Sequence, residues 1–401
     1  MAKVLNRLST RAARIMIAVA FVGLVYAQKS AVEQAWDLLA QDKRSEALAL
    51  LRSEVRKHPV DAEARLLLGS MLAESGETAE ALTHLREGVR LRPKDAMAHN
   101  ALGEALTDAG DVNAARDAFQ KAVELDGTFA QARENLGLAL LEMKNLEGAA
   151  EQLDQAIRLF GESEDAAYSR YLRARVHTAS GEIEEAEKQL ERAVKLRPSL
   201  AEAWSDLGQA RDSLGNDDGA LVALKRAVEV NPDGAVAHTR LGSLYLRVGK
   251  PSDAVSHLER AVRLSPDNQT ALNNLQLALR EIGNKERADQ VKAQLAELFR
   301  KRDQESQNAL SAVKLNNEGA ELERKGNLPG AAEKYRAALE LNPGHAGMRV
   351  NYAVALLRLG RWERGLEELR MALRQDPSNE VVRKALQDAL AQAPPASREP
   401  K

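Results

Sequence analysis

Residues 201–234 contain two amphipathic helical patterns joined by a polar turn. Within each pattern the key positions recur at spacings of three, four and seven, which places them on one face of a helix. The turn contains Gly215 and the polar residues after it, and Pro232 ends the second pattern. The two faces are formed by Trp204, Leu207, Gly208 and Arg211, and by Ala220, Leu224 and Ala227. The stretch therefore predicts a pair of helices.

The same pattern of 34 residues recurs along nearly the whole chain. Ten repeats, numbered 1 to 10 below, start near residues 28, 62, 96, 130, 167, 201, 235, 269, 312 and 346. The twentieth place of every repeat is alanine or glycine, which predicts that two helices approach closely there. These residues are Ala47, Ala81, Ala115, Ala149, Ala186, Ala220, Ala254, Ala288, Ala331 and Gly365.

Glycine and proline recur at three further places. Glycine inside a helix costs about 0.5–1 kcal/mol relative to alanine, so its repetition at the eighth place indicates close packing that offsets this cost. Glycine at the fifteenth place predicts a positive φ after the first helix, and proline at the thirty-second place ends the second helix. The eighth place holds Gly69, Gly103, Gly137, Gly208, Gly242 and Gly319, and the fifteenth holds Gly76, Gly110, Gly181, Gly215, Gly249, Gly283, Gly326 and Gly360.

These features resemble the tetratricopeptide repeat (TPR). The resemblance rests on the period of 34, the W-x2-L-G spacing of Trp204, Leu207 and Gly208, the repeated alanines and the terminal proline. It implies an all-α fold, an α-solenoid superhelix of about ten helix-turn-helix repeats with a C-terminal capping helix. A single helix pair cannot cover its apolar stripe, whereas stacked pairs share one core.

Repeat 8 departs from the pattern. It has Gln276 at the eighth place, Lys292 where other repeats have leucine or an aromatic residue, and Arg300 in place of proline. Its second helix is therefore expected to continue over residues 285–306. The expected organisation is a signal segment over 1–27, an array over 28–302, a joint over 303–311, two repeats over 312–379, a capping helix over 380–393 and a disordered tail over 394–401. The joint is either a bend or a domain boundary.

The N-terminus has the form of a secretory signal. A segment with four basic residues precedes an apolar run over residues 15–26, and small residues precede a cleavage position after Ala27. The run is shorter than the roughly 20 residues that span a bilayer as a helix. We expect an exported protein, periplasmic or extracellular in a bacterial cell; the alternative is an uncleaved N-terminal anchor.

Composition excludes several classes of function. Beyond the signal the chain has 53 basic and 59 acidic residues, a formal charge of −6, which does not favour binding to nucleic acid. There is no cysteine, so disulfides and thiolate chemistry are excluded. No two of the seven histidines are spaced i, i+3 or i+4, and neither a catalytic constellation nor a phosphate-binding loop is found. We therefore expect no enzyme activity, no metal and no cofactor.

The resemblance also implies which places face an inner groove, namely the second, fifth, sixth, ninth, twelfth and thirteenth. At these places repeats 2 to 4 have acidic residues and no basic ones, whereas the charged residues of repeats 7 to 10 are mostly arginine, so the groove is expected to run from acidic to basic. The pairs Asn317 with Arg324 and Asn351 with Arg358 are similar to family clamps for peptide carboxylates, although the clamp lysines are missing. The alternative is that these residues are ordinary solvated surface. The candidate partner-binding residues are Arg240, Arg247, Asn274, Arg280, Asn317, Arg324, Asn351 and Arg358.

Two functions follow from this sequence. The favoured one is an exported adaptor that holds a peptide or helix of a partner protein in its groove, as the resemblance implies. The alternative is a structural envelope scaffold that assembles with itself or with envelope components through its convex face and its ends, with a homo-oligomer as its product.

Overall fold

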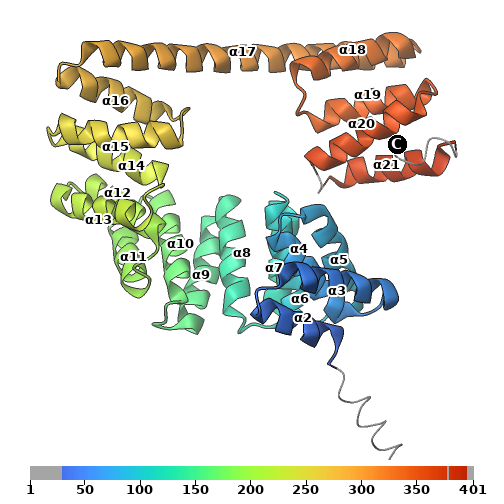
Figure 1. Ribbon diagram of the computed structural model, residues 1–401, viewed down its shortest axis with the longest axis horizontal. Helices are drawn as coiled ribbons and strands as arrows, with labels where there is room; N and C mark the ends of the chain where they lie inside the picture. Colours follow the sequence, from blue (N-terminus) through green and yellow to red (C-terminus); the bar gives the residue numbers. More distant parts are fainter. Residues whose placement is uncertain (1–28, 377–378, 395–401) are drawn as a thin grey trace, which may run out of the picture. The chain divides into compact units, whose positions relative to one another are not determined.

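The computed structural model describes residues 29–376 and 379–394 (Figure 1). The secondary structure of these residues is entirely α-helical, with no β-strand, as expected. None of their helices is long and apolar enough to cross a bilayer. The signal predicted over residues 1–27 and all of the predicted tail except Pro394 lie outside the described residues. The chain divides after Asp126 into two compact parts, which are described separately.

In the N-terminal part, the described residues from 29 to 126 form three antiparallel helix pairs, one for each of repeats 1 to 3. Its core is formed by one face of each helix and includes Leu51, Leu68 and Leu72, all fully buried. The helices are α2 (Ala31–Ala40), α3 (Arg44–Lys57), α4 (Ala62–Glu74), α5 (Thr78–Leu91), α6 (Ala96–Asp108) and α7 (Val112–Leu125).

The C-terminal part, from Gly127, contains repeats 4 to 10 and a final helix. Repeats 4 to 7 are the pairs α8 (Ala130–Glu142) and α9 (Leu146–Phe160), α10 (Ala166–Ala179) and α11 (Ile183–Leu196), α12 (Ala201–Ser213) and α13 (Asp217–Val230), and α14 (Ala235–Arg247) and α15 (Pro251–Leu264). The remaining helices are α16 (Gln269–Glu281), α17 (Lys285–Arg324), α18 (Leu328–Leu341), α19 (Ala346–Arg358), α20 (Trp362–Gln375) and α21 (Glu380–Gln392).

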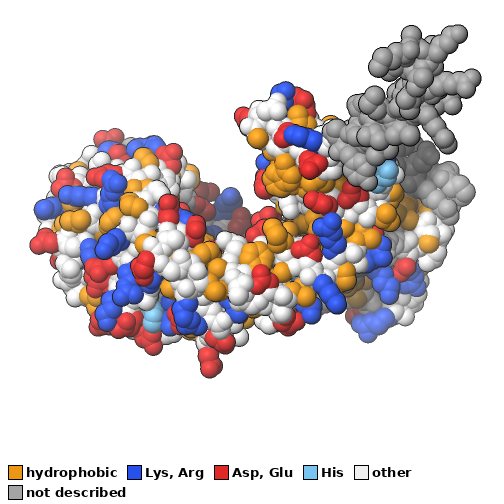
Figure 2. All heavy atoms as spheres, turned by 90° about the horizontal axis from the view of Figure 1, so that it is seen from below, with side chains coloured by type: hydrophobic (Ala, Val, Ile, Leu, Met, Phe, Trp, Pro, Cys, Tyr) orange, Lys and Arg blue, Asp and Glu red, His pale blue; other side chains and the backbone are white. Residues whose placement is uncertain are grey.

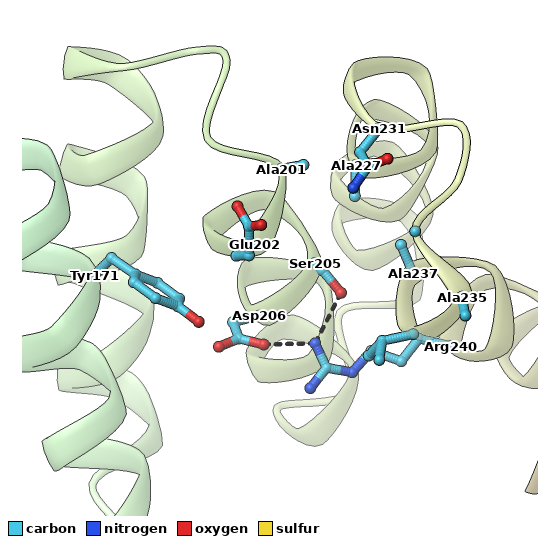
Figure 3. A pocket seen from close by; sticks show the side chains of 12 residues that line it. Tyr171, Ala201, Glu202, Ser205, Asp206, Ala227, Asn231, Ala235, Ala237 and Arg240 are labelled. Carbon is cyan, nitrogen blue, oxygen red and sulfur yellow. Dashed lines mark hydrogen bonds and ion pairs between the residues drawn. The ribbon is translucent and has the colours of Figure 1, made fainter. Parts of the chain in front are cut away.

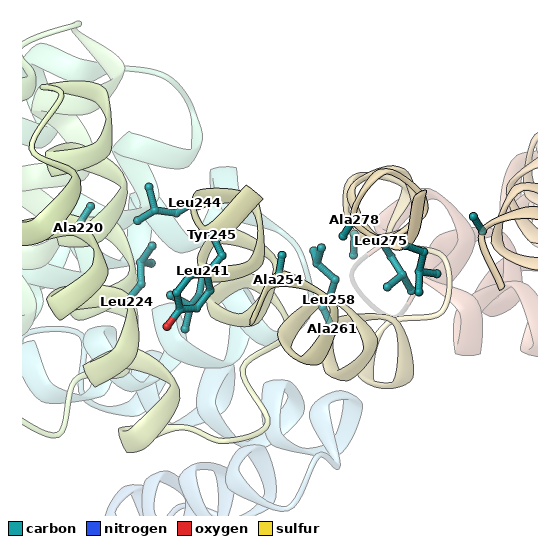
Figure 4. Close-up of a cluster of buried hydrophobic side chains, with 13 residues drawn as sticks. Ala220, Leu224, Leu241, Leu244, Tyr245, Ala254, Leu258, Ala261, Leu275 and Ala278 are labelled. Atoms are coloured by element: carbon teal, nitrogen blue, oxygen red, sulfur yellow. The ribbon is translucent and has the colours of Figure 1, made fainter. Parts of the chain in front are cut away.

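The glycine at the eighth place makes room for the side chain at the twenty-fourth place of the same repeat. A Cβ added to Gly208 would lie only 2.4 Å from Cγ of Leu224 and 3.3 Å from the carbonyl oxygen of Ala220. The corresponding Cβ on Gly242 would lie 2.5 Å from Cγ of Leu258. The predicted close packing is confirmed, and it explains why the twentieth place needs a small residue. Figure 4 shows the core that continues from Ala220 and Leu224 to the next repeat.

The turn between the two helices of a repeat keeps one backbone conformation. All eight glycines at the fifteenth place have φ between 71° and 81°. Repeats 1 and 4 lack this glycine, yet Asp42 and Lys144 occupy the same place with φ of 60° and 61°. The helix packing therefore fixes the turn even where the residue is not glycine, the residue type that reaches this conformation without strain.

In six repeats a hydrogen bond from the fourth place ties the preceding loop to the helix that follows it. Trp204 Nε1 donates to the carbonyl of Pro198 (3.0 Å), and His238 Nε2 donates to that of Pro232 (3.1 Å). Residues Arg65, His99, Arg133 and Arg349 bond in the same way to the carbonyl six residues earlier. Because the fourth-place side chain is the donor, both His99 and His238 are structural residues.

Arg170 shows what the insertion around residues 161–164 changes. Arg170 occupies the fourth place of repeat 5, and its guanidinium bonds Glu162 (2.7 Å) and Gln189 (3.3 Å). Its Nε is buried without a hydrogen-bond partner among the described residues. In six other repeats a side-chain nitrogen at this place reaches the loop carbonyl, so the longer loop before repeat 5 has displaced that acceptor.

The helix α17 joins repeats 8 and 9 without a break, and Figure 1 shows it as one long rod. Its first turns pair with α16, its last turns pair with α18, and every residue from 299 to 307 between them is exposed. The predicted continuation of the second helix of repeat 8 is confirmed, but the expected joint over 303–311 is itself helical. The division into compact parts falls after Asp126.

The helix α21 covers the end of repeat 10. Val382, Ala389 and Ala393 are buried, and this face packs on Leu366 and Leu369 of α20. Lys384, Gln387 and Asp388 are exposed on the other side of the helix. The helix therefore closes the apolar end of the stack and presents a polar face to solvent, as an end-capping helix does.

Candidate partner-binding pocket

The C-terminal part contains a pocket of about 320 Å³ that is lined mainly by the first helices of repeats 5, 6 and 7 (Figure 3). The helix α10 contributes Tyr171, α12 contributes Glu202, Ser205 and Asp206, and α14 contributes Val236 and Arg240. Alanines and the loop that begins at Asn231 complete the lining. The remaining residues that line the pocket are Ala201, Ala227, Asn231, Gly234, Ala235 and Ala237.

An ion pair between neighbouring repeats forms one wall of the pocket. Arg240 donates to the Ser205 hydroxyl (2.8 Å) and to the Asp206 carboxylate (2.5 Å), as Figure 3 shows. All three side chains are at least partly buried. The guanidinium is therefore held in place and its charge is compensated by Asp206.

The Tyr171 side chain forms the opposite wall. Burial, with the negative charge of Asp206 as a second cause, raises the pKa of the Tyr171 hydroxyl to about 12, so it is neutral at physiological pH. No hydrogen bond joins this hydroxyl to another described residue. The ring lies 5.7 Å from that of Tyr168, and the guanidinium of Arg175 lies 5.9 Å from its centroid. The hydroxyl is thus a polar group free to meet a ligand.

The neighbouring repeat 4 contributes a buried carboxylate. Glu134 accepts hydrogen bonds from the Ser169 hydroxyl (2.6 Å) and from Gln131 (3.1 Å). Burial raises the pKa of Glu134 above its ordinary value, while these hydrogen bonds oppose the shift. Of the two acidic side chains at groove places of repeat 4, Glu134 therefore bonds to repeat 5 and does not face solvent, whereas Glu142 is exposed.

Of the candidate residues predicted from the sequence, the pocket contains only Arg240. Arg247 pairs with Asp212 and Asp217, and Arg358 pairs with Glu323. These carboxylates lie in the preceding repeat, at distances of 30 to 35 residues in sequence. The basic end expected for the groove is therefore largely compensated at these three arginines. Figure 2 likewise shows acidic and basic side chains interspersed on the face that it draws.

The other candidates are distributed over α16, α17 and α19. Asn274 donates to Ser243 (2.6 Å), and Asn351 donates to Asn316 (3.0 Å), so both connect neighbouring first helices. Asn317 and Arg280 are exposed, and the Nε of exposed Arg324 donates weakly to the carbonyl of Ala320 (3.4 Å). The Asn317 and Arg324 pair and the Asn351 and Arg358 pair are thus in different environments, and the clamp stays a prediction.

Sequence reasoning missed Tyr171, Glu202, Ser205 and Asp206. All four occupy groove places, namely the fifth place of repeat 5 and the second, fifth and sixth places of repeat 6. The signal in the sequence is a tyrosine at a groove place of repeat 5 followed by two carboxylates at groove places of repeat 6. Aspartate at one sixth place and arginine at the next would also have predicted the Asp206 and Arg240 pair.

The described residues contain no group of three histidine, aspartate or glutamate side chains placed to hold a metal ion. The nearest approach of two histidines is that of His238 and His257, whose Nδ1 atoms lie 3.1 Å apart. Because His238 Nε2 donates to Pro232, its Nδ1 accepts and the Nδ1 of His257 donates. The pair therefore joins α14 to α15 as a hydrogen bond between neutral rings.

Comparison with known proteins agrees with this architecture. The chain is similar to the solved structure of a tetratricopeptide repeat protein from Parabacteroides merdae, with 15% identity over 62% of this chain and 97% of that one, and a TM-score of 0.50. It is also similar to pilF of Pseudomonas aeruginosa, with 19% identity over 53% of this chain and 95% of that one, and a TM-score of 0.48. At these identities the likeness concerns the fold alone.

A third similar structure is YrrB, described as a TPR protein with an unusual peptide-binding site. It has 24% identity over 47% of this chain and 96% of that one, and a TM-score of 0.38. No curated protein is found to be similar in sequence. A family model, described as tetratricopeptide repeat, matches residues 32–96, 73–128, 100–167, 134–187, 171–235, 239–294 and 316–380. Since these matches cover most of the chain, the protein belongs to the tetratricopeptide repeat family.

Proposed function

We propose that the protein is an exported, non-enzymatic scaffold that binds an extended segment of a partner protein along its first helices. Stacked repeats of this family present extended binding surfaces, and members generally bind proteins or peptides. The observation that carries the proposal is the pocket at repeats 5 to 7. It combines an apolar floor with a few convergent polar groups, which is the usual composition of a ligand site.

Crosslinking from two matched valines tests this proposal. Val236 lies in the pocket and is 59% exposed, whereas Val222 lies on the second helix α13 and is 64% exposed. A photoreactive amino acid at position 236 is expected to crosslink a partner in the native cell, and the same group at position 222 is not. Equal crosslinking at both positions, or crosslinking only at 222, would place binding on another face.

Export is the second element of the proposal, and the basic, apolar and small-residue succession of residues 1–27 supports it. The expected mature protein begins at Gln28. The intact mass of protein recovered from the native host tests this directly. A mass that retains residues 1–27 would favour the N-terminal anchor.

Self-assembly is a second candidate function, and one observation on α17 favours it. Phe299, Leu310 and Val313 are 47%, 73% and 47% exposed, although they are apolar. Their spacings of eleven and three residues place them on one face of the helix. A second copy of the chain that packed on this face would give a mass that rises with protein concentration. Leu310→Lys should abolish that rise, whereas Val222→Lys should not.

A further inference from the structure

The pocket at repeats 5 to 7 offers uncommitted negative charge but no uncommitted positive charge. We propose that it binds a lysine or arginine side chain of the partner segment. This proposal rests on the proposed function, because it names the chemistry of the segment that the first helices would bind. It differs from the carboxylate-binding clamp expected from the sequence.

The charges of the lining residues favour a cationic ligand. The lining contains one cationic side chain, Arg240, whose guanidinium already binds Ser205 and Asp206. An anionic ligand at Arg240 would have to compete with the Asp206 carboxylate beside it. Glu202, by contrast, is exposed at the pocket and has no ion pair with any described residue. A cationic ligand therefore finds a free carboxylate, and an anionic ligand finds no free cation in the lining.

The Tyr171 wall of the pocket offers a hydrogen-bond acceptor to a cationic group. The hydroxyl of Tyr171 points toward the interior of the site near Asp206 (Figure 3), and its oxygen can accept a hydrogen bond from an ammonium or guanidinium group. Arg175, which is not part of the lining, lies over the ring at 5.9 Å from its centroid. One face of this ring thus already contacts a guanidinium, within the range of a cation–π contact. The hydroxyl edge remains for the ligand.

The apolar floor of the pocket fits the aliphatic part of a lysine or arginine side chain. Lysine and arginine have long aliphatic stems that pack on apolar surface while the charged group reaches polar partners. Val236 and the alanines Ala201, Ala235 and Ala237 line the pocket, and Val236 is largely exposed. A short acidic side chain would leave this floor uncovered. A leucine would cover it but would bury the Glu202 carboxylate without a partner, which is costly.

Selection from a display library of random twelve-residue peptides tests the inference. The purified protein is expected to enrich sequences with lysine or arginine, and these should bind with a dissociation constant that rises about tenfold in Glu202→Gln, the effect of losing one charge-assisted contact. Glu147→Gln is the matched control, since Glu147 is an exposed glutamate on the second helix α9. The peptides selected by the wild-type protein should bind Glu147→Gln with an unchanged dissociation constant.

The reversed variant sharpens the test. Glu202→Lys should lose the basic peptides and select acidic ones, and its melting temperature should match that of the wild type because Glu202 is exposed. Selected peptides without a basic preference, or binding unchanged by Glu202→Gln, would overturn the inference and leave the proposed function standing. If no peptide is enriched at all, both the inference and the proposed function fail. Enrichment of acidic peptides by the wild type would restore the clamp hypothesis.

Discussion

Repeats 6 and 7 and repeats 8 and 9 are built from the same pattern but meet in opposite ways. Between repeats 6 and 7, Leu224 of α13 and Leu241, Leu244 and Tyr245 of α14 belong to one buried cluster (Figure 4). Among the described residues no such cluster joins repeats 8 and 9, since α17 continues between them through exposed residues. The difference shows that a few side chains decide whether a repeat stacks on its neighbour or is held apart from it.

The two ends that α17 separates are polar where the regular interface is apolar. At the twenty-fourth place Lys292 is exposed, whereas Leu224 is buried. At the seventh and tenth places of repeat 9, Glu318 and Glu321 replace the leucines found at positions 241 and 244. Glu318 pairs with Lys334, and Glu321 pairs with Lys325. Both ends are therefore solvated surfaces, as expected for the ends of a helical stack.

Within the exposed section, α17 is stabilised by its own side chains. Arg300 pairs with Glu297 (2.7 Å), and Lys301 pairs with Glu305 (3.9 Å). Gln304 and Gln307 also bond residues four positions away. Such pairs contribute about 0.2–0.5 kcal/mol each to an isolated helix. With arginine in place of proline at position 300, nothing in the sequence ends the helix.

Truncation at the twenty-fourth place should separate the two regions most clearly. Leu224→Ala removes a buried side chain and leaves a cavity, which typically costs about 2–5 kcal/mol in the free energy of unfolding. Lys292→Ala at the same place of repeat 8 removes only an exposed side chain and should change it by less than about 0.5 kcal/mol. Denaturant melts measure both values. Similar losses would mean that repeat 8 packs as repeat 6 does.

A helix-breaking residue in the exposed section of α17 should have the next largest effect, which is local opening of the helix. Proline in a helix interior costs about 3 kcal/mol or more, so Ser306→Pro should open the helix locally. Residues 299–307 are all exposed, and Arg302 is the one described residue among them that hydrogen-bonds outside α17, to Asp267 and Gln269. The repeats on both sides should therefore keep their melting behaviour. Limited proteolysis should find a new cleavage site there, and Ser306→Ala should remain uncut. General unfolding of Ser306→Pro would show that α17 transmits stability between the repeats.

Overpacking at the twentieth place should be destabilising although it adds apolar surface. Ala220 is fully buried and its carbonyl lies against Gly208, so Ala220→Leu should cost about 1–3 kcal/mol. The control is Ala293→Leu on an exposed position of α17. Chemical denaturation of the two variants checks the difference. A neutral result at position 220 would mean that the two helices have room to separate.

The ion pairs between repeats should contribute less. Arg247→Ala breaks the exposed pairs with Asp212 and Asp217 and is expected to cost at most about 1 kcal/mol, less at high salt. Arg280 is exposed and forms no ion pair with a described residue, so Arg280→Ala should leave the melting temperature unchanged. Thermal melts of both variants at two salt concentrations measure the difference. Equal losses of stability in Arg247→Ala and Arg280→Ala would show that the ion pairs of Arg247 do not stabilise the fold.

The histidine pair predicts a small dependence on pH that repeat 8 lacks. Burial lowers the pKa of both His238 and His257 in the folded protein below the unfolded value of about 6.5. The unfolded chain then binds more protons, so stability should fall as the pH drops below about 6.5. In His238→Leu/His257→Val, which copies Leu272 and Val291 of repeat 8, this fall should diminish. An unchanged pH profile of the melting temperature would contradict this assignment.

The sequence was sufficient for the fold because the repeats agree with one another. Ten small residues at one place and eight glycines at another fix how each helix pair packs, and the structure confirms both features. It was not sufficient for the site. Whether Arg240 faces a ligand or an aspartate depends on the neighbouring repeat, and the pocket exists only where three first helices meet. Hydrogen bonds such as that of Trp204 to Pro198 also join helix to loop without any periodic signal in hydrophobicity.

The helix α17 has a consequence for how the protein tolerates insertions. An extra residue in a loop between repeats is absorbed locally, as the insertion around 161–164 is. An extra residue in the exposed section of α17 has no loop to absorb it, so it would advance repeats 9 and 10 by about 1.5 Å and rotate them by about 100° around the helix axis. The length of α17, forty residues, thus determines the direction in which the last two repeats point, and a change of one residue in that length would alter this direction.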